Sequence, residues 1–274
     1  IGDNAGRFNT GGNNTFVGVN AGKRGTTGAT SNNTFVGQSA GLNNTGGNNT
    51  VVGHQALAYG QGGANNTIMG YLAGQDFTSS NNVAIGSSAA LNVTSGTRVI
   101  AIGANSLDAA TTESDNIAIG YDALGGAVSG AEKTTAIGNF SLASLTSGDE
   151  NLGIGYYAGN SLADGGENTL IGNYAGRNIT SANRNVAIGH EALDANTTGN
   201  DNIAIGSQSL GAITTGSTNN IGIGFRAGKV MSANAQHNTL IGGYEAGGGL
   251  GDGDYNVMIG TFAGQTATGS SWAN

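Results

Sequence analysis

Short apolar triplets, each closed by a glycine, recur along the whole chain and set its hydrophobic pattern. In the stretches 15–18 (TFVG) and 83–86 (VAIG), a β-branched residue stands first, an aliphatic residue stands third, and another apolar residue stands between them. Glycine-punctuated, β-branched triplets are poor helix formers and suit a pleated strand. Each triplet therefore predicts one short β-strand.

The glycine that closes each triplet, called here the repeat glycine, returns every 16 to 19 residues. The sixteen repeat glycines are Gly2, Gly18, Gly37, Gly53, Gly70, Gly86, Gly103, Gly120, Gly138, Gly155, Gly172, Gly189, Gly206, Gly224, Gly242 and Gly260. Self-similarity at such a period is typical of a solenoid. We predict an all-β fold, a parallel β-solenoid of about sixteen coils, one per ~17-residue repeat, in one continuous domain over residues 1–274. Because Ile1 stands within a repeat, we expect a fragment of a longer fibre protein.

The two-residue period of a strand places the first and third residues of each triplet on one face. We expect that pair to face the interior and the middle residue, two before the repeat glycine, to face outward. The middle residue is also mostly apolar, as at Ala118, Leu170 and Ala204. An apolar outer face on a thin coil needs a second surface to cover it, so the pattern predicts lateral oligomerisation through the middle residues.

Asparagine stands four residues before most repeat glycines, with Val99 and Thr134 as exceptions. In stacked coils such side chains can form a hydrogen-bonded ladder or satisfy turn backbone, and we predict that role here. Glycosylation is the weaker interpretation of the Asn-x-Thr sequences that overlap this motif. These sequences include the ones at Asn13, Asn32, Asn48 and Asn65. The spacer between repeats, such as residues 196–200, is rich in turn formers and is expected to face solvent.

Composition narrows the possible functions. The chain holds 52 Gly, no Pro, no Cys and 9% charged residues, which departs from the profile of an ordinary enzyme. A formal net charge of −8 without any cluster of Lys and Arg argues against nucleic acid as a partner. No apolar run approaches the roughly 18 residues of a membrane span, so no membrane insertion is expected in this segment.

Three copies of the repeat carry a resemblance to a known family. They read NNVAIGSSAA at 81–90, DNIAIGYDAL at 115–124 and RNVAIGHEAL at 184–193. These resemble the head repeats of trimeric autotransporter adhesins of the YadA type, and the NNTFVG form is similar to repeats of bacteriophage tail fibres. The resemblance implies a left-handed β-roll, a homotrimer, and an extracellular place on a cell surface or virion. The period here is longer than that of the usual adhesin head.

Aromatic residues provide the candidate ligand-binding site. Phe140, Tyr157 and Tyr174 stand two residues after the repeat glycine in successive copies and would stack about 5 Å apart if the coils pair as strands do. Tyr244 and Phe262 repeat this pattern near the end of the chain. Exposed aromatic rows bind sugar faces, but they also stabilise solenoids by stacking, and we favour the stabilising role. Tyr71, Tyr121, Tyr156 and Phe225 hold the neighbouring position.

No catalytic, cofactor or metal site is predicted. His54 and His190 share one repeat position and His237 lies elsewhere, so no set of metal ligands converges. Asp252 and Asp254 are too few for a calcium loop. The adjacent acids at 149–150 are the one close carboxylate pair among scattered carboxylates, and they offer no preferred acid–base site. The stretches GIGYYAG and GIGFRAG are copies of the repeat, not dinucleotide loops.

These observations predict a non-enzymatic, structural extracellular fibre segment that mediates adhesion or receptor binding. Its partners would be two further copies of the chain and a host-surface glycan or protein, with no cofactor. The alternative is a self-assembling extracellular filament, in which open coil ends stack end to end because an uncapped solenoid exposes strand edges.

Overall fold

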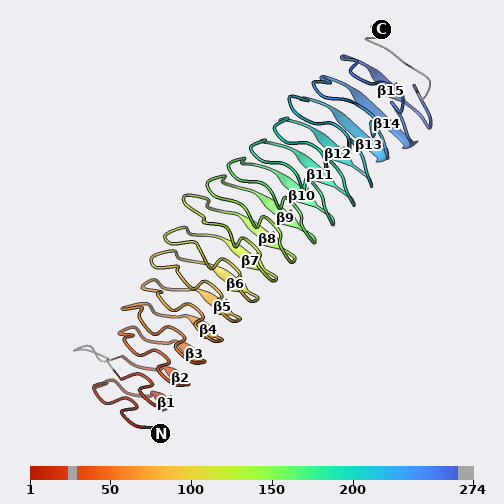
Figure 1. Cartoon of the computed structure of the whole chain (residues 1–274). Helices are drawn as coiled ribbons and strands as arrows, with labels where there is room; N and C mark the ends of the chain where they lie inside the picture. Colours follow the sequence, from red (N-terminus) through yellow and green to blue (C-terminus); the bar gives the residue numbers. More distant parts are fainter. Residues whose placement is uncertain (24–29, 265–274) are drawn as a thin grey trace. The chain divides into compact units, whose positions relative to one another are not determined.

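The computed structural model describes residues 1–23 and 30–264, and among them it contains strands and turns but no helix. Contacts group the chain into two compact units, Ile1–Thr134 and Thr135–Asn274. In both units each repeat makes one coil with one short strand, followed by a long turn that returns the chain to the start of the next strand (Figure 1). The prediction of an all-β, parallel β-solenoid with one coil per repeat is confirmed.

In the first unit, consecutive strands pair in parallel, so that Thr15 lies opposite Thr34 and Phe16 opposite Phe35. The described strands of this unit are β1 (Thr15–Val17), β2 (Thr34–Val36), β3 (Thr50–Val52), β4 (Thr67–Met69), β5 (Val83–Ile85), β6 (Ile100–Ile102) and β7 (Ile117–Ile119). Identical triplet positions thus form straight columns along the unit.

The second unit repeats the arrangement with the same parallel register, for example Ala187 opposite Ala204. Its described strands are β8 (Thr135–Ile137), β9 (Leu152–Ile154), β10 (Thr169–Ile171), β11 (Val186–Ile188), β12 (Ile203–Ile205), β13 (Ile221–Phe225), β14 (Thr239–Tyr244) and β15 (Val257–Ile259). A register shift between Ile223 and Phe225 interrupts the pairing of β13 with β14.

The predicted orientation of the strands is wrong, because the middle residue of the triplet points into the coil. Ala118, Leu170 and Ala204, expected at an outer interface, are completely buried inside their own units. The flanking residues face outward instead, and Met69 and Ile188 remain 45% and 36% exposed. The middle residues fill the interior together with residues of the following turn and one spacer residue, so no room is left for the flanking pair.

The interior is filled by matching a large residue with a small one. Phe35, in the middle of β2, leaves no space at Gly41, where an added Cβ would lie 2.5 Å from the Phe35 ring. In most coils whose middle residue is alanine, as at Ala118, the corresponding turn position carries a buried leucine, here Leu124. Gly153 is small for the same reason, since a Cβ there would lie 2.7 Å from Leu142 Cγ. Because the interior is closely packed, the size of the middle residue limits the size of the turn residue that faces it.

The predicted asparagine ladder is confirmed, and it lies inside the coils. Asn33 is fully buried; its backbone N–H donates to Asn14 Oδ1 at 2.9 Å, and its side-chain Nδ2 donates to Gly46 O at 3.1 Å. Each such amide supplies the partners that buried backbone groups require. A second ladder runs on the outside: Asn13, one residue earlier, donates to Asn32 Oδ1 at 3.3 Å, and Asn32 donates to Asn48 Oδ1 at 3.1 Å. Asn13, Asn32, Asn48 and Asn65, the Asn-x-Thr asparagines named above, belong to this outer ladder.

The spacer does not simply face solvent as expected. One spacer residue in most coils turns inward and is buried, and Asn196 is an example within the stretch 196–200. Its side chain accepts from Gly199 N at 2.9 Å and donates to Gly199 O at 2.8 Å, so the buried amide is satisfied by its own turn. In other coils the buried spacer residue is apolar, as at Phe77, Val93, Ala110, Val128, Leu145, Leu162, Ile179, Ile213, Met231 and Leu250.

Candidate functional site

The turn after the repeat glycine holds the aromatic candidates. The residue two after that glycine adopts a left-handed backbone conformation in the described coils, apart from the coil of Gly242, with φ of 60° at Phe140, 57° at Tyr157 and 60° at Tyr174. Asparagine and glycine accept this conformation most readily, so aromatic residues here need compensating contacts. Because the coils are in register, the three rings form one column in the second unit.

The column is a stack, as predicted. Ring centroids lie 4.8 Å apart for Phe140 and Tyr157 and 5.9 Å apart for Tyr157 and Tyr174, with interplanar angles of 30° and 24°. The Arg177 guanidinium caps the end of the stack, 5.0 Å from the Tyr174 centroid. The rings are half-buried and cover one another's faces. This geometry favours the stabilising role over direct stacking on a sugar.

The cap on the stack is itself held by an ion pair. Arg177 Nη2 donates to Asp194 Oδ2 at 3.0 Å. Burial is the main reason that the pKa of the Asp194 carboxyl lies above its usual value, although Arg177 acts to lower it. The second carboxylate oxygen, Oδ1, is buried and has no hydrogen-bond partner. Asp194 therefore depends on Arg177 for its stabilisation.

Tyr156 is a candidate functional residue that lies beside the column and not in it. It follows the repeat glycine directly, lies 4.5 Å from Tyr157 at 74° and 5.6 Å from Tyr174 at 84°, and is 41% exposed. Its backbone N–H donates to Asn173 Oδ1 at 3.1 Å. The signal available in the sequence was its position: exposed aromatic residues collect directly after the repeat glycine, at Tyr71, Tyr121, Tyr156 and Phe225.

The second predicted row has a different register. Gly243 inserts one residue after the repeat glycine, so Tyr244 pairs with Phe225, and Glu245 takes the left-handed position with φ of 46°. The prediction that Tyr244 repeats the position of Tyr157 is therefore wrong. Its ring still contacts Phe225 at 5.3 Å and Phe262 at 5.2 Å, which makes a continuous row.

The three histidines take part in ring contacts. His54 stacks on Tyr71 at 5.5 Å, His237 stacks on Tyr255 at 4.8 Å, and His190 meets Tyr174 edge-on at 6.1 Å. Across residues 1–23 and 30–264, no three His, Cys, Asp or Glu side chains gather as metal ligands. Asp254 of the predicted DGD pair accepts from Gln236 N at 2.7 Å, which is a role in turn structure.

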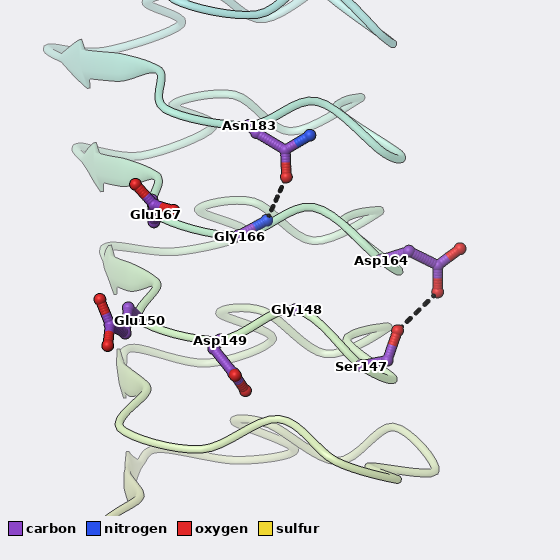
Figure 2. Close-up of a pocket in the computed structure, with 8 residues that line it drawn as sticks. All are labelled: Ser147, Gly148, Asp149, Glu150, Asp164, Gly166, Glu167 and Asn183. Carbon is purple, nitrogen blue, oxygen red and sulfur yellow. Dashed lines mark hydrogen bonds between the residues drawn. The ribbon is translucent and has the colours of Figure 1, made fainter.

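The adjacent acids Asp149 and Glu150 line an open groove of about 340 Å³ in the second unit. The groove is lined by Ser147, Gly148, Asp149, Glu150, Asp164, Gly166, Glu167 and Asn183. Figure 2 shows Glu150 and Glu167 beside the strands and Asp164 at the far end of its coil, so the carboxylates do not converge. Asp164 Oδ1 accepts from Ser147 Oγ at 3.2 Å, and Asn183 Oδ1 accepts from Gly166 N at 2.8 Å. A paired acid and base for glycoside hydrolysis is not formed there.

The glycine-rich stretch 153–159 is one strand end and its turn. Gly153 and Ile154 belong to β9, and the residues that follow form the aromatic corner, so the helix that a dinucleotide loop requires does not follow. Within the described ranges, the structure holds no helix of the length and apolarity needed to cross a bilayer. Comparison with known proteins gives no match to a family model, to a curated protein or to a solved structure.

Proposed function

We propose that this chain is a structural segment of an extracellular fibre that mediates adhesion, and that it associates laterally with two further copies of itself. The observation that carries the proposal is the outer sheet face, formed by the first and third residues of each described strand. No residue of this face is charged in any of these strands. The three-fold count and the extracellular place rest on the resemblance to YadA-type heads and tail fibres.

The outer sheet face has the chemistry of an interface core. Its third-residue column consists of Val17, Val36, Val52, Met69, Ile85, Ile102, Ile119, Ile137, Ile154, Ile171, Ile188, Ile205, Ile223, Ile241 and Ile259. Monomeric proteins rarely leave contiguous apolar patches of more than a few hundred Å² in water, and charged residues are depleted at interface cores. Lateral association would bury this column and the column formed by the first residues of the strands. It would do so through the flanking residues, not through the middle residues that the pattern first indicated.

The borders of this face support the same proposal. The position five before the repeat glycine carries mostly polar or charged side chains, and several of them pair along the column. Arg184 Nε donates to Asp201 Oδ1 at 2.7 Å, and this bond is the main reason that the pKa of Asp201 lies below its usual range. An apolar centre with a polar border is the common anatomy of protein interfaces.

The test places charge on the outer sheet face. Ile85→Lys, Ile102→Lys and Ile119→Lys, combined in one variant, would bury unpaired ammonium groups in the interface, which is strongly unfavourable. A control variant with Ser95→Lys, Ala127→Lys and Ser129→Lys makes the same change in net charge at exposed spacer positions of the same unit. Light scattering and sedimentation report the mass of each.

We expect the wild type and the control to run as an oligomer and the outer-face variant to run as the 26.9 kDa chain. A monomeric wild type at micromolar concentration would contradict the proposal. So would an outer-face variant that keeps the oligomeric mass and its circular dichroism spectrum.

A further inference from the structure

Tyr156 lies flat against the side of the aromatic stack. The faces of Tyr157 are covered by Phe140 and Tyr174, so a perpendicular ring whose centroid lies 4.5 Å away must meet the edge of Tyr157 with its own face. The Tyr156 centroid lies 6.4 Å from that of Phe140 and 5.6 Å from that of Tyr174, and the interplanar angles are 77° and 84°. These values fit a placement of Tyr156 over the edges of all three rings. The opposite face of Tyr156 is left toward solvent, in agreement with its 41% exposure.

The ring is held in place before any ligand arrives. Its inner face rests on the stack, and its backbone N–H is bonded to Asn173 Oδ1 at 3.1 Å. Binding to a ring that is already ordered loses little side-chain entropy, which is the usual advantage of preorganisation. Most other exposed rings of the second unit lack such support from a three-ring stack, since Phe225, Tyr244 and Phe262 form a simple row.

Polar groups border the open face. Asn139 and Asn173 occupy the same turn position as Tyr156 in the preceding and following coils, about 4.8 Å away along the column, and both are exposed. Primary amides offer donors and acceptors together, which suits the hydroxyl groups at the rim of a sugar ring. An aromatic platform between two amides matches a pyranose, which has one apolar face and an edge of hydroxyls.

The charges near the platform favour a neutral ligand. Arg177, the cation of this cluster, is stacked on Tyr174 and bonded to Asp194 Oδ2 at 3.0 Å. A sugar carboxylate would therefore compete with an existing ion pair. Glu191 lies next to His190, with the nearest oxygen and nitrogen 3.8 Å apart, and adds negative charge to the same corner.

We propose that the outer face of Tyr156, bordered by Asn139 and Asn173, is a binding site for a neutral pyranose of a surface glycan. This inference rests on the proposed adhesive function and gives it a ligand class and a site. The stacked residues Phe140, Tyr157 and Tyr174 position Tyr156 and do not themselves touch the sugar.

The experiment is saturation-transfer NMR with the methyl pyranosides of glucose, galactose, mannose and N-acetylglucosamine, and with a methyl sialoside as the anionic probe. We expect at least one neutral pyranoside to bind the wild type and the sialoside to give no transfer. Tyr156→Ser should weaken that binding about tenfold, the ratio that corresponds to roughly 1.4 kcal/mol of lost ring contact. Tyr156→Phe keeps the platform and should bind like the wild type.

Tyr71→Ser is the matched control, because Tyr71 holds the same turn position and is 54% exposed, but one of its faces is stacked on His54. It should leave sugar binding unchanged. The inference is overturned if none of the four neutral pyranosides binds, if Tyr156→Ser binds as tightly as the wild type, or if the sialoside binds best. Light scattering on the same samples distinguishes the two proposals. An intact oligomer that binds no sugar would contradict the sugar site alone. A monomer that binds sugar would contradict lateral association alone.

Discussion

At the scale of single residues, the fold depends on backbone conformations that most side chains avoid. The repeat glycines adopt φ between 125° and 146° where the structure shows a positive value for them, a region open to glycine almost alone. At Gly53, φ is 142°, and an added Cβ would lie 2.1 Å from Gly70 O in the next coil. Two independent constraints, conformation and contact with the neighbouring coil, therefore demand glycine there.

Gly53→Ala should lower the free energy of unfolding by about 3 kcal/mol or more, from backbone strain and overpacking together. Gly12→Ala is the control, since a Cβ at Gly12 meets nothing within 4 Å, and we expect a change within roughly 0.5 kcal/mol. Urea denaturation followed by circular dichroism measures both. Equal stability of the two variants would contradict the constraint.

Glu113 makes a second residue-scale prediction. It is only 4% exposed, and its carboxylate accepts from the backbone N–H groups of Thr111 and Thr112 at 2.8 Å and of Gly130 at 3.0 Å. Burial acts to raise the pKa of Glu113, but these hydrogen bonds and one from its own backbone N–H together outweigh it, and the pKa lies below its usual value. The carboxylate therefore stabilises the fold above the ordinary glutamate pKa of about 4.3, and this stabilisation is lost as the pH falls through the lower folded-state pKa.

Glu113→Gln should destabilise the chain by about 1–3 kcal/mol at pH 7, because an amide replaces a charged acceptor of three buried donors. The difference from the wild type should shrink as the pH falls through the lowered pKa of Glu113, because the wild-type carboxylate then takes up its proton. Thermal melts of both proteins from pH 7 to pH 3 measure this difference in stability. A difference that stays constant over that range would show that the charge on Glu113 is irrelevant.

At the scale of the coil, stability comes from matching the middle residue of the strand with the turn residue that faces it. Phe35 with Gly41 and Ala118 with Leu124 fill the same interior space in opposite ways. The turn position keeps a left-handed backbone with either residue, with φ of 57° at Gly41 and 52° at Leu124. The backbone conformation is thus constant, and only the side-chain volume is exchanged.

Phe35→Ala should cost about 3–5 kcal/mol through the cavity that it leaves. Gly41→Leu alone should also be strongly destabilising, since the Phe35 ring occupies the space. The double variant recreates the Ala118 and Leu124 pair, and we expect it to recover most of the lost stability. A double-mutant cycle by chemical denaturation measures the coupling, and purely additive losses would show that the two positions do not share a space.

The stack makes a further prediction at the scale of the coil. Replacing Phe140, Tyr157 and Tyr174 together by Ser removes the two ring contacts within the stack and the contacts of these rings with Tyr156 and His190, each of about 0.5–1.5 kcal/mol, along with the burial of three half-exposed rings. We expect a clear fall in the melting temperature of the second unit. An unchanged melting curve would mean that the stack contributes nothing to stability.

The strand pattern allowed the fold, the parallel register and the ring stack to be predicted, because all three follow from the repeat spacing. It did not allow the inner face to be identified, since both faces of each triplet are apolar. The missing signal was present in the size relation between positions such as Phe35 and Gly41, which only residues sharing an interior obey. The orientation of Tyr156 follows from ring packing, which spacing alone does not determine.

At the scale of the whole molecule, each coil bonds mainly to the coils before and after it. The backbone N–H of Thr34 donates to Asn49 O at 2.9 Å, and that of Thr50 donates to Asn66 O at 2.9 Å, so the bonds run from coil to coil. In such architectures, stability is approximately a sum over coils and their nearest neighbours.

A local defect should therefore remain local. In Gly53→Ala, we expect faster amide hydrogen exchange in β2, β3 and β4 and unchanged exchange in β9, β10 and β11, measured by mass spectrometry after proteolysis. Uniformly faster exchange throughout both units would instead indicate that the chain opens as one cooperative block.

The size matching inside the coils also limits how such a gene can grow or shrink. Recombination between near-identical repeats adds or deletes whole coils, and nearest-neighbour bonding lets the chain accept a new length. The space at Gly159, however, is filled by Leu142 from the coil before and Leu170 from the coil after, each within 3 Å of where a Cβ would stand. A duplicated coil therefore keeps a well-packed interior only if the neighbouring coils that fill it are duplicated too. We expect heritable changes in length to add or delete short runs of adjacent repeats together.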